Sequence, residues 1–233
     1  SILLLIFAAC SSSSDTTKTD TSNDTTSNEN SSETVTISHE FDEVEVQKNP
    51  EKVVVFDFGV LDTLDHFGID IVGLPQMGVP SYLNKYTSDE YENLGSLKEP
   101  DFEKIDQIRP DLIIISARQA ELYDELAKLG PVVYLAIDTT NYVESFKENL
   151  QIIGQIFDIE DKINEEITAI EEKINDVSAK ASELNKNALI LLANENKVSA
   201  YGKGSRYGLI HDEFGIPAVD EGIESSTHGM NVT

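Results

Sequence analysis

The sequence predicts an α/β protein of two lobes, each with a short parallel sheet, joined by one long helix. Between residues 53 and 135, apolar runs of strand length alternate with helical stretches. An apolar stripe from Ile159 to Val177 then recurs at spacings of four and three, which indicates a helix of about 23 residues. Strand signals resume after it, at 188–201. Alternating strands and helices favour parallel sheets covered on both faces.

The first ten residues resemble the end of a secretory signal peptide. An apolar run leads into Ala8, Ala9 and Cys10, as in the bacterial lipobox, where the cysteine receives diacylglycerol. Phe7 departs mildly from the leucine that is preferred there. We therefore expect residues 1–9 to be a signal-peptide remnant and Cys10 to be lipidated.

A polar segment follows the cysteine. Residues 11–33 are nearly all Ser, Thr, Asn, Asp and Glu, a composition that cannot bury enough apolar surface to offset the entropy of ordering. Residues 10–33 are expected to form a lipidated cysteine with a flexible tether. This arrangement predicts a lipid-anchored protein on the extracellular face of the cell membrane.

Charge and cysteine content exclude several classes of partner and site. The formal charge is −26, from 43 acidic and 17 basic residues, so nucleic acid and anionic lipid surfaces would be repelled. A single cysteine excludes an intrachain disulfide and a zinc site built on cysteine pairs. Against this acidic background, individual arginines call for an explanation.

The first lobe is expected over residues 34–142. Its predicted elements, in chain order, are a hairpin over 34–37 and 44–46, a strand over 53–56, a helix over 59–67 closed by Gly68, a strand over 69–72, a helix from a cap at Asp101 to 108, a strand over 112–115, a helix over 119–129 and a strand over 132–135. Helices between the strands predict parallel pairing.

The remaining chain should supply the connecting helices and the second lobe. Residues 143–182 are predicted to form one helix to 157 and then the long helix between the lobes. Residues 183–233 carry strands at 188–192 and 198–201 and a helix over 207–214. A lobe of similar size would need roughly 100 residues, so the second lobe is expected to be incomplete.

Two arginines lie where an anion could bind. Arg118 follows the strand 112–115, and open parallel sheets bind ligands at the carboxyl ends of their strands. Arg206 lies in the glycine-rich loop 202–208, whose backbone N–H groups could approach an anion, with Lys203 assisting. The alternatives are an exposed arginine at a helix start and a simple basic turn.

Aromatic side chains could form the walls of the same site. Tyr82, Tyr201 and Tyr207 are the candidates, although tyrosine is as often a core or rim residue. The glycine spacing of the loop 202–208 does not match a dinucleotide fingerprint or a P-loop.

Several phrases resemble the solute-binding proteins for cobalamin and ferric siderophores. They are Asn49-Pro50-Glu51-Lys52-Val53-Val54-Val55-Phe56, Asp101-Phe102-Glu103-Lys104-Ile105 and Arg109-Pro110-Asp111-Leu112-Ile113-Ile114-Ile115-Ser116. The similarity covers about residues 34–233 and is strongest to the branch of Gram-positive bacteria that binds catecholate and petrobactin-type siderophores. This resemblance implies a class III periplasmic-binding-protein-like fold.

The resemblance also implies roles for individual residues. Arg118 and Arg206 would be the ligand-contacting arginines of the two lobes. His228 would reach the iron when the siderophore leaves a coordination site open, or it would be a loop histidine without a role. Glu103 would dock on arginines of an ABC permease, or it would simply stabilise a helix start. The implied protein is a monomer with no cofactor of its own, and its ligand is a ferric siderophore.

The sequence favours a binding protein over an enzyme. No H-E-x-x-H, G-x-S-x-G or Walker motif occurs. The alternatives within the binding class are receptors for haem, cobalamin or a hydroxamate siderophore. A secreted hydrolase with a scattered active site and an adhesive surface lipoprotein are the alternatives outside it.

Overall fold

A computed structural model describes residues 33–223 and 229–232. The expected signal remnant, the lipidation site Cys10, nearly all of the tether and the proposed iron ligand His228 lie outside the described residues. Within the described part of the chain, no helix has both the length and the apolar character needed to cross a bilayer.

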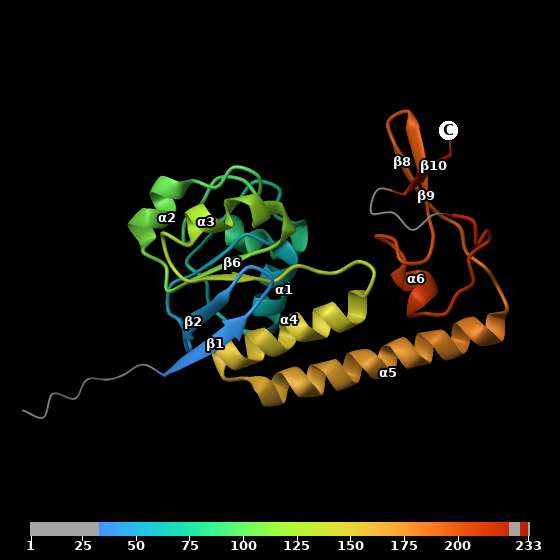
Figure 1. Ribbon diagram of the computed structural model, residues 1–233, viewed down its shortest axis with the longest axis horizontal. Coiled ribbons are helices and arrows are strands. Elements are labelled where there is room, and N and C mark those ends of the chain that lie inside the picture. Colours follow the sequence, from blue (N-terminus) through green and yellow to red (C-terminus); the bar gives the residue numbers. More distant parts are fainter. Residues whose placement is uncertain (1–32, 224–228, 233) are drawn as a thin grey trace, which may run out of the picture. The chain divides into compact units, whose positions relative to one another are not determined.

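The first lobe contains a five-stranded sheet in the order β5-β4-β3-β6-β7, and every neighbouring pair is parallel (Figure 1). The strands are β3 (Val53–Val55), β4 (Gly73–Leu74), β5 (Glu92–Asn93), β6 (Leu112–Ile115) and β7 (Val132–Tyr134). The expected parallel sheet is therefore confirmed.

The strand expected at 69–72 is wrong in position, because β4 begins only at Gly73. The backbone N–H of Ile69 donates to the carbonyl of Leu64 and so helps to close the preceding helix. The chain joins the sheet at Val72, whose N–H donates to the carbonyl of Val53.

Helices cover both faces of the sheet, as the continuous apolar runs of β3 and β6 predicted. On one face, Val54, Ile113 and Ile115 share a core with α2 (Phe102–Ile108) and α3 (Tyr123–Leu126). On the other face, Val53, Val55 and Ile114 share a core with α1 (Phe58–Phe67) and α4 (Tyr142–Phe157). Alternate residues of each strand thus reach opposite cores.

Local capping explains where α1 and α2 begin and end. The Asp57 side chain accepts hydrogen bonds from the N–H groups of Gly59 and Val60, and α1 ends at Gly68 with φ of 69°. Asp101 caps α2 by accepting from the N–H of Lys104 at 3.1 Å. Both predicted helices are confirmed.

The helix expected over 119–129 is broken into two pieces. A 3₁₀ helix, η2, spans Ala117–Leu122, and α3 follows as a single turn. Gln119 is fully buried, accepts a hydrogen bond from the N–H of Ser116 and donates to the carbonyl of Leu97. This reciprocal cap with Ser116 starts the helical turn two residues earlier than the apolar pattern indicates.

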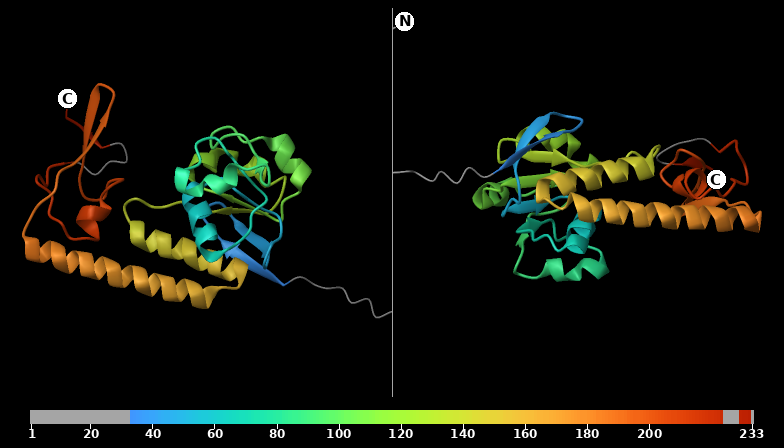
Figure 2. Two further views of the ribbon diagram at one scale, coloured as in Figure 1. Left: turned by 180° about the vertical axis from the view of Figure 1, so that it is seen from behind. Right: turned by 90° about the horizontal axis from the view of Figure 1, so that it is seen from below.

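A hairpin and two further helices complete this region. Strands β1 (Thr34–Ser38) and β2 (Glu43–Gln47) pair antiparallel, which confirms the predicted hairpin. A second 3₁₀ helix, η1, covers Ser81–Thr87. Helix α5 (Glu160–Leu184) has 25 residues and lies beside α4 (Figure 2). Its apolar stripe is buried near its start, at Ile163, whereas Val177 is 39% exposed.

The C-terminal region contains an antiparallel sheet, so the parallel sheet expected there is wrong. Strands β8 (Ile190–Asn194), β9 (Lys197–Tyr201) and β10 (Met230–Asn231) follow the order β10-β9-β8. Two residues, Glu195 and Asn196, connect β8 to β9, and a parallel pair would need a crossover of about a dozen. Within the described residues, the parallel pairing of this region is a single bridge between Ala188 and Ala218.

The helix expected over 207–214 is shorter than predicted. Helix α6 spans only Leu209–Asp212. The turn before it is tight, because the N–H of Gly208 donates to the carbonyl of Ser205 at 2.8 Å.

We expect Asp57→Ala to lower the free energy of unfolding by about 1–2 kcal/mol, because Asp57 caps α1 and also accepts from Ser116 Oγ. Urea denaturation followed by circular dichroism measures the change. Asp62→Ala is the matched control, since Asp62 is an exposed carboxylate in the same helix, and its effect should stay within about 0.5 kcal/mol. Equal losses in the two variants would contradict the capping role.

Candidate functional site

A cavity lies where the chain reverses its direction across the sheet. From β3 the chain builds outward to β4 and β5, and then returns to place β6 on the other side of β3. In open parallel sheets, this switch point leaves a crevice at the carboxyl ends of the two strands. Asp57 follows β3 and Ser116 follows β6, and Ser116 Oγ donates to Asp57 Oδ2 at 2.8 Å. One hydrogen bond thus joins the two loops that begin the site.

The cavity has a volume of about 680 Å³, within the range of small-molecule sites. Its walls are Asp57, Gly59, Val60, Thr63, Ser116, Ala117, Arg118, Leu135, Ile137, Asp138, Thr139, Tyr142, Phe146, Asn149, Leu150, Ile153 and Arg206. Most of them come from the carboxyl ends of β3, β6 and β7 and from α4.

Two of the three arginines in the chain line this cavity. Arg118 lies in η2 and Arg206 lies in the loop after β9, and both side chains are exposed. Among the salt bridges of the described residues, neither guanidinium has a carboxylate partner, although the chain carries 43 acidic residues. The charge of a guanidinium group is permanent, and within the described residues no carboxylate neutralises it, so both groups can bind an anion.

The carboxylates in the cavity wall are committed to local donors. Asp57 accepts from two backbone N–H groups and from Ser116, as described above. Asp138 accepts from the N–H and Oγ1 of Thr140, at 2.8 and 2.7 Å, and these bonds hold the pKa of Asp138 below its ordinary value. Both acids thus use their oxygens within the loops rather than on the arginines.

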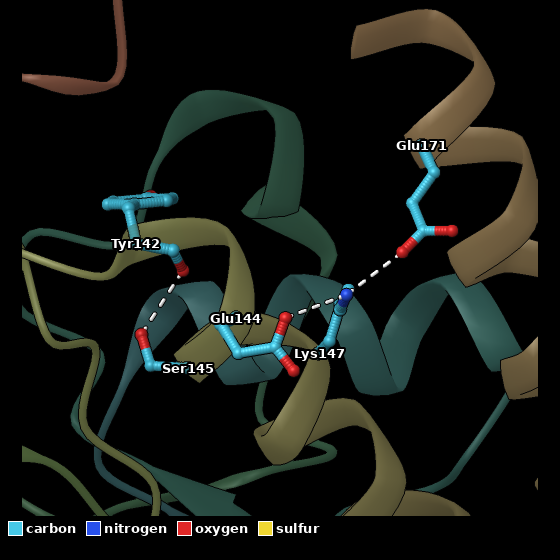
Figure 3. A network of polar contacts seen from close by, with 5 residues as sticks. All are labelled: Tyr142, Glu144, Ser145, Lys147 and Glu171. Carbon is cyan, nitrogen blue, oxygen red and sulfur yellow. Dashed lines mark hydrogen bonds and ion pairs between the residues drawn. The ribbon is translucent and has the colours of Figure 1, made fainter. Parts of the chain in front are cut away.

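The first turns of α4 supply an aromatic wall, formed by Tyr142 and Phe146. Ser145 fixes this turn, because its Oγ donates to the Tyr142 carbonyl at 3.1 Å and accepts from the Asp138 N–H at 3.1 Å. Figure 3 shows the hydrogen bond between Ser145 and the Tyr142 carbonyl. The hydroxyl therefore holds the loop after β7 against the start of α4.

The same helix is tied to α5 by an ion pair. Lys147 Nζ lies 2.8 Å from Glu144 Oε2 and 2.9 Å from Glu171 Oε1, and these carboxylates raise the pKa of Lys147 (Figure 3). Glu171 belongs to α5, so the lysine links the aromatic wall of the cavity to the long helix.

The sequence-based reasoning missed Tyr142 and Phe146. The predicted helix began at Val143, which left Tyr142 outside it. Their spacing of four residues, just after a strand end, is the signal that could have identified them.

The glycine-rich loop 202–208 differs from its expected use. The N–H of Gly204, one of the glycine-loop groups expected to approach a ligand anion, donates to Asp212 Oδ2 at 2.7 Å. A Cβ atom placed on Gly208 would lie 2.6 Å from the same oxygen and 2.8 Å from the Gly204 nitrogen. The carboxylate of Asp212 therefore occupies the concave side of the loop.

Three predicted residues that are near Arg206 in the sequence do not line the cavity. The Arg206 guanidinium carbon is 5.8 Å from the centroid of the Tyr207 ring, and Tyr201 meets that ring edge-on at 4.8 Å. Tyr201 is only 2% exposed, so the Tyr207 ring packs against a buried side chain. Lys203 instead pairs with Glu221 at 3.5 Å.

Two predicted residues lie elsewhere in the first lobe. Tyr82 is 69% exposed in η1 and is not part of the cavity wall. Glu103 is exposed in the first turn of α2 and accepts from Gln107 Nε2 at 3.4 Å. Across residues 33–223 and 229–232, no group of three His, Cys, Asp or Glu side chains is arranged to hold a metal ion.

Comparison with known proteins gives matches along most of the chain. Residues 59–230 match the model of the periplasmic binding protein family. The petrobactin-binding protein YclQ of Bacillus subtilis is 47% identical over 237 residues, which cover 100% of this chain and 72% of YclQ.

Solved structures give the same result. The crystal structure of YclQ matches with a TM-score of 0.84 and 52% identity, over 86% of this chain and 72% of that one. The periplasmic catecholate-siderophore binding protein VctP of Vibrio cholerae matches with a TM-score of 0.78 and 31% identity, over 86% and 73%. The α/β architecture and the sequence thus agree, and the chain belongs to the periplasmic binding protein family.

Proposed function

We propose that this protein binds a ferric siderophore of the catecholate or petrobactin type outside the cytoplasm and delivers it to an ABC importer. The observation that carries the proposal is the pair of arginines in one cavity, Arg118 and Arg206, neither of which has a carboxylate partner among the described residues. The names of YclQ and VctP, which refer to petrobactin and catecholate siderophores, support the same ligand class.

The chemistry of the cavity suits such a ligand. A ferric tris-catecholate complex is a bulky anion, and guanidinium groups provide permanent charge with several hydrogen-bond donors. Tyr142 and Phe146 add aromatic surface on which catechol rings can pack. The site therefore binds and releases its ligand without transforming it, and ATP hydrolysis belongs to another subunit of the importer.

The remaining residues take roles outside the cavity in this proposal. Cys10 carries the lipid anchor on the extracellular face of the membrane, and the polar segment that follows it is the tether. His228 reaches the iron when the siderophore leaves a coordination position open. Glu103 docks on the permease, and the protein acts as a monomer without a cofactor of its own.

We expect Arg118→Ala and Arg206→Ala each to weaken binding of a ferric catecholate siderophore by about 1.5–3 kcal/mol, the range for hydrogen bonds to charged groups. Quenching of intrinsic fluorescence measures the affinity, and the emission comes from tyrosine because the chain has no tryptophan. Arg109→Asn is the matched control. It removes the same charge outside the cavity, and asparagine tolerates the φ of 53° at that position. Affinities equal to that of the parent in both cavity variants would contradict the assigned site.

Tyr142→Ala should weaken binding of the ferric catecholate by about two- to twelvefold, because it removes an aromatic contact worth about 0.5–1.5 kcal/mol. Tyr142→Phe should bind like the parent, since it keeps the ring. Tyr82→Ala removes an exposed tyrosine outside the cavity and is the control. The fluorescence titration described above measures the affinity of each variant. A loss of affinity in Tyr142→Phe equal to that in Tyr142→Ala would show that the ring face is not the contact.

Glu103→Lys should leave siderophore affinity unchanged and reduce iron uptake, because the exposed carboxylate of α2 lies outside the cavity. Uptake of radioactive iron by cells that depend on this protein gives the second measurement. Glu160→Lys makes the same charge change in the first turn of α5 and serves as the control. Normal uptake by the Glu103 variant would exclude the docking role.

A further inference from the structure

The loop that carries Arg206 is built around an internal carboxylate. Asp212 Oδ2 accepts from the N–H of Gly204 at 2.7 Å, and the loop returns to Asp212 within eight residues. We infer that Asp212 is a positioning residue for ligand binding, which fills the concave face of this loop and thereby holds Arg206 at the cavity. The inference rests on the proposed function, because it assigns Asp212 a part in the same site.

The contacts around Asp212 make the loop a closed unit. Ser205 is buried and its Oγ donates to the Gly202 carbonyl at 2.6 Å. The N–H groups of His211 and Asp212 both donate to the Gly208 carbonyl, at 2.7 and 2.8 Å. The short helix α6 and the loop therefore share their hydrogen bonds, and the Asp212 side chain closes the remaining gap between them.

Glycine at 208 leaves just enough space for the carboxylate. A Cβ atom there would lie 2.6 Å from Asp212 Oδ2, 2.8 Å from the Gly204 nitrogen and 2.9 Å from the Ser205 nitrogen, and no real Cβ makes contacts that short. Successive backbone N–H groups of this kind form a concavity suited to an anion. In this protein the Asp212 carboxylate occupies that concavity. A ligand would therefore contact side chains of the loop rather than its backbone N–H groups.

This arrangement has two consequences for Arg206. Its neighbours Ser205 and Tyr207 belong to the closed loop, so the backbone that presents the guanidinium is held in place. In addition, the nearby carboxylate of Asp212 accepts from backbone and has no salt bridge to Arg206 among the described residues. The positive charge of Arg206 therefore stays available to the ligand.

The test is a double-mutant cycle with a ferric catecholate siderophore as the probe, read by tyrosine fluorescence on the full chain. Asp212→Ala should weaken binding by about tenfold, because the loop loses its central acceptor. Asp212→Asn should stay within about twofold of the parent, since its side-chain oxygen can still accept from Gly204. Asp220→Ala is the control, because Asp220 also accepts from a backbone N–H nearby, that of Gly222.

Coupling distinguishes positioning from a general loss of structure. The double variant Asp212→Ala/Arg206→Ala should bind no more weakly than Arg206→Ala alone. In the double variant with Arg118→Ala, by contrast, the losses in binding free energy from the two substitutions should add. Full additivity with both arginine variants would overturn the inference, and so would tighter binding by Asp212→Ala, which would assign the loop backbone to the ligand.

A second variant guards against misfolding. Asp212→Ser, whose hydroxyl is too short to reach Gly204, should reproduce the loss with a native circular dichroism spectrum. Parent-like affinity in this folded variant contradicts the positioning role. Failure of the proposed function looks different, because Arg118→Ala and Arg206→Ala would then bind like the parent whatever Asp212 does.

Discussion

Two guanidinium groups that have no carboxylate partner within residues 33–223 and 229–232, in a chain of formal charge −26, are the feature on which the proposed site depends. Free arginines are unexpected beside so many acids. In the described part of the chain, the carboxylates of Asp57, Asp138 and Asp212 each accept from backbone N–H groups instead of pairing with these arginines. The same bonds that shape the loops thus satisfy these carboxylates without an arginine, and the cavity wall sets Arg118 and Arg206 against only Asp57 and Asp138 in an otherwise strongly acidic chain.

The scaffold around the arginines is stiff where the cavity needs it. Strands β3 and β6 are buried on both faces, and the Asp57–Ser116 hydrogen bond joins the loops that leave them. Ser145 joins the loop after β7 to α4, and Lys147 joins α4 to α5. Because each wall is attached to a strand end or a helix, the site can be held open before a ligand arrives, which reduces the ordering cost of binding.

The fold was predictable where local chemistry decides it, and less so where tertiary contacts do. The runs at 53–56 and 112–115, the cap at Asp101 and the glycine at 68 each carry their own signal. Arg118 followed from its place after a strand. The hairpin of β8 and β9 lacks the glycine-containing turn from which a hairpin can be predicted. The hydrogen bond from Gly204 to Asp212 depends on how the loop closes in space, which the sequence pattern does not give. Tyr142 joins the site only through the packing of α4 against the sheet.

The most direct test of this account compares ligands of different charge on the unmodified protein. Tyrosine fluorescence titrations should give the affinities for a ferric tris-catecholate, which is an anion, and for a ferric tris-hydroxamate of similar size, which is neutral. We expect a preference of at least about tenfold for the anion, and a smaller preference at high salt because exposed charges are screened. Equal affinity for both complexes at low salt would contradict a cavity organised by two free arginines.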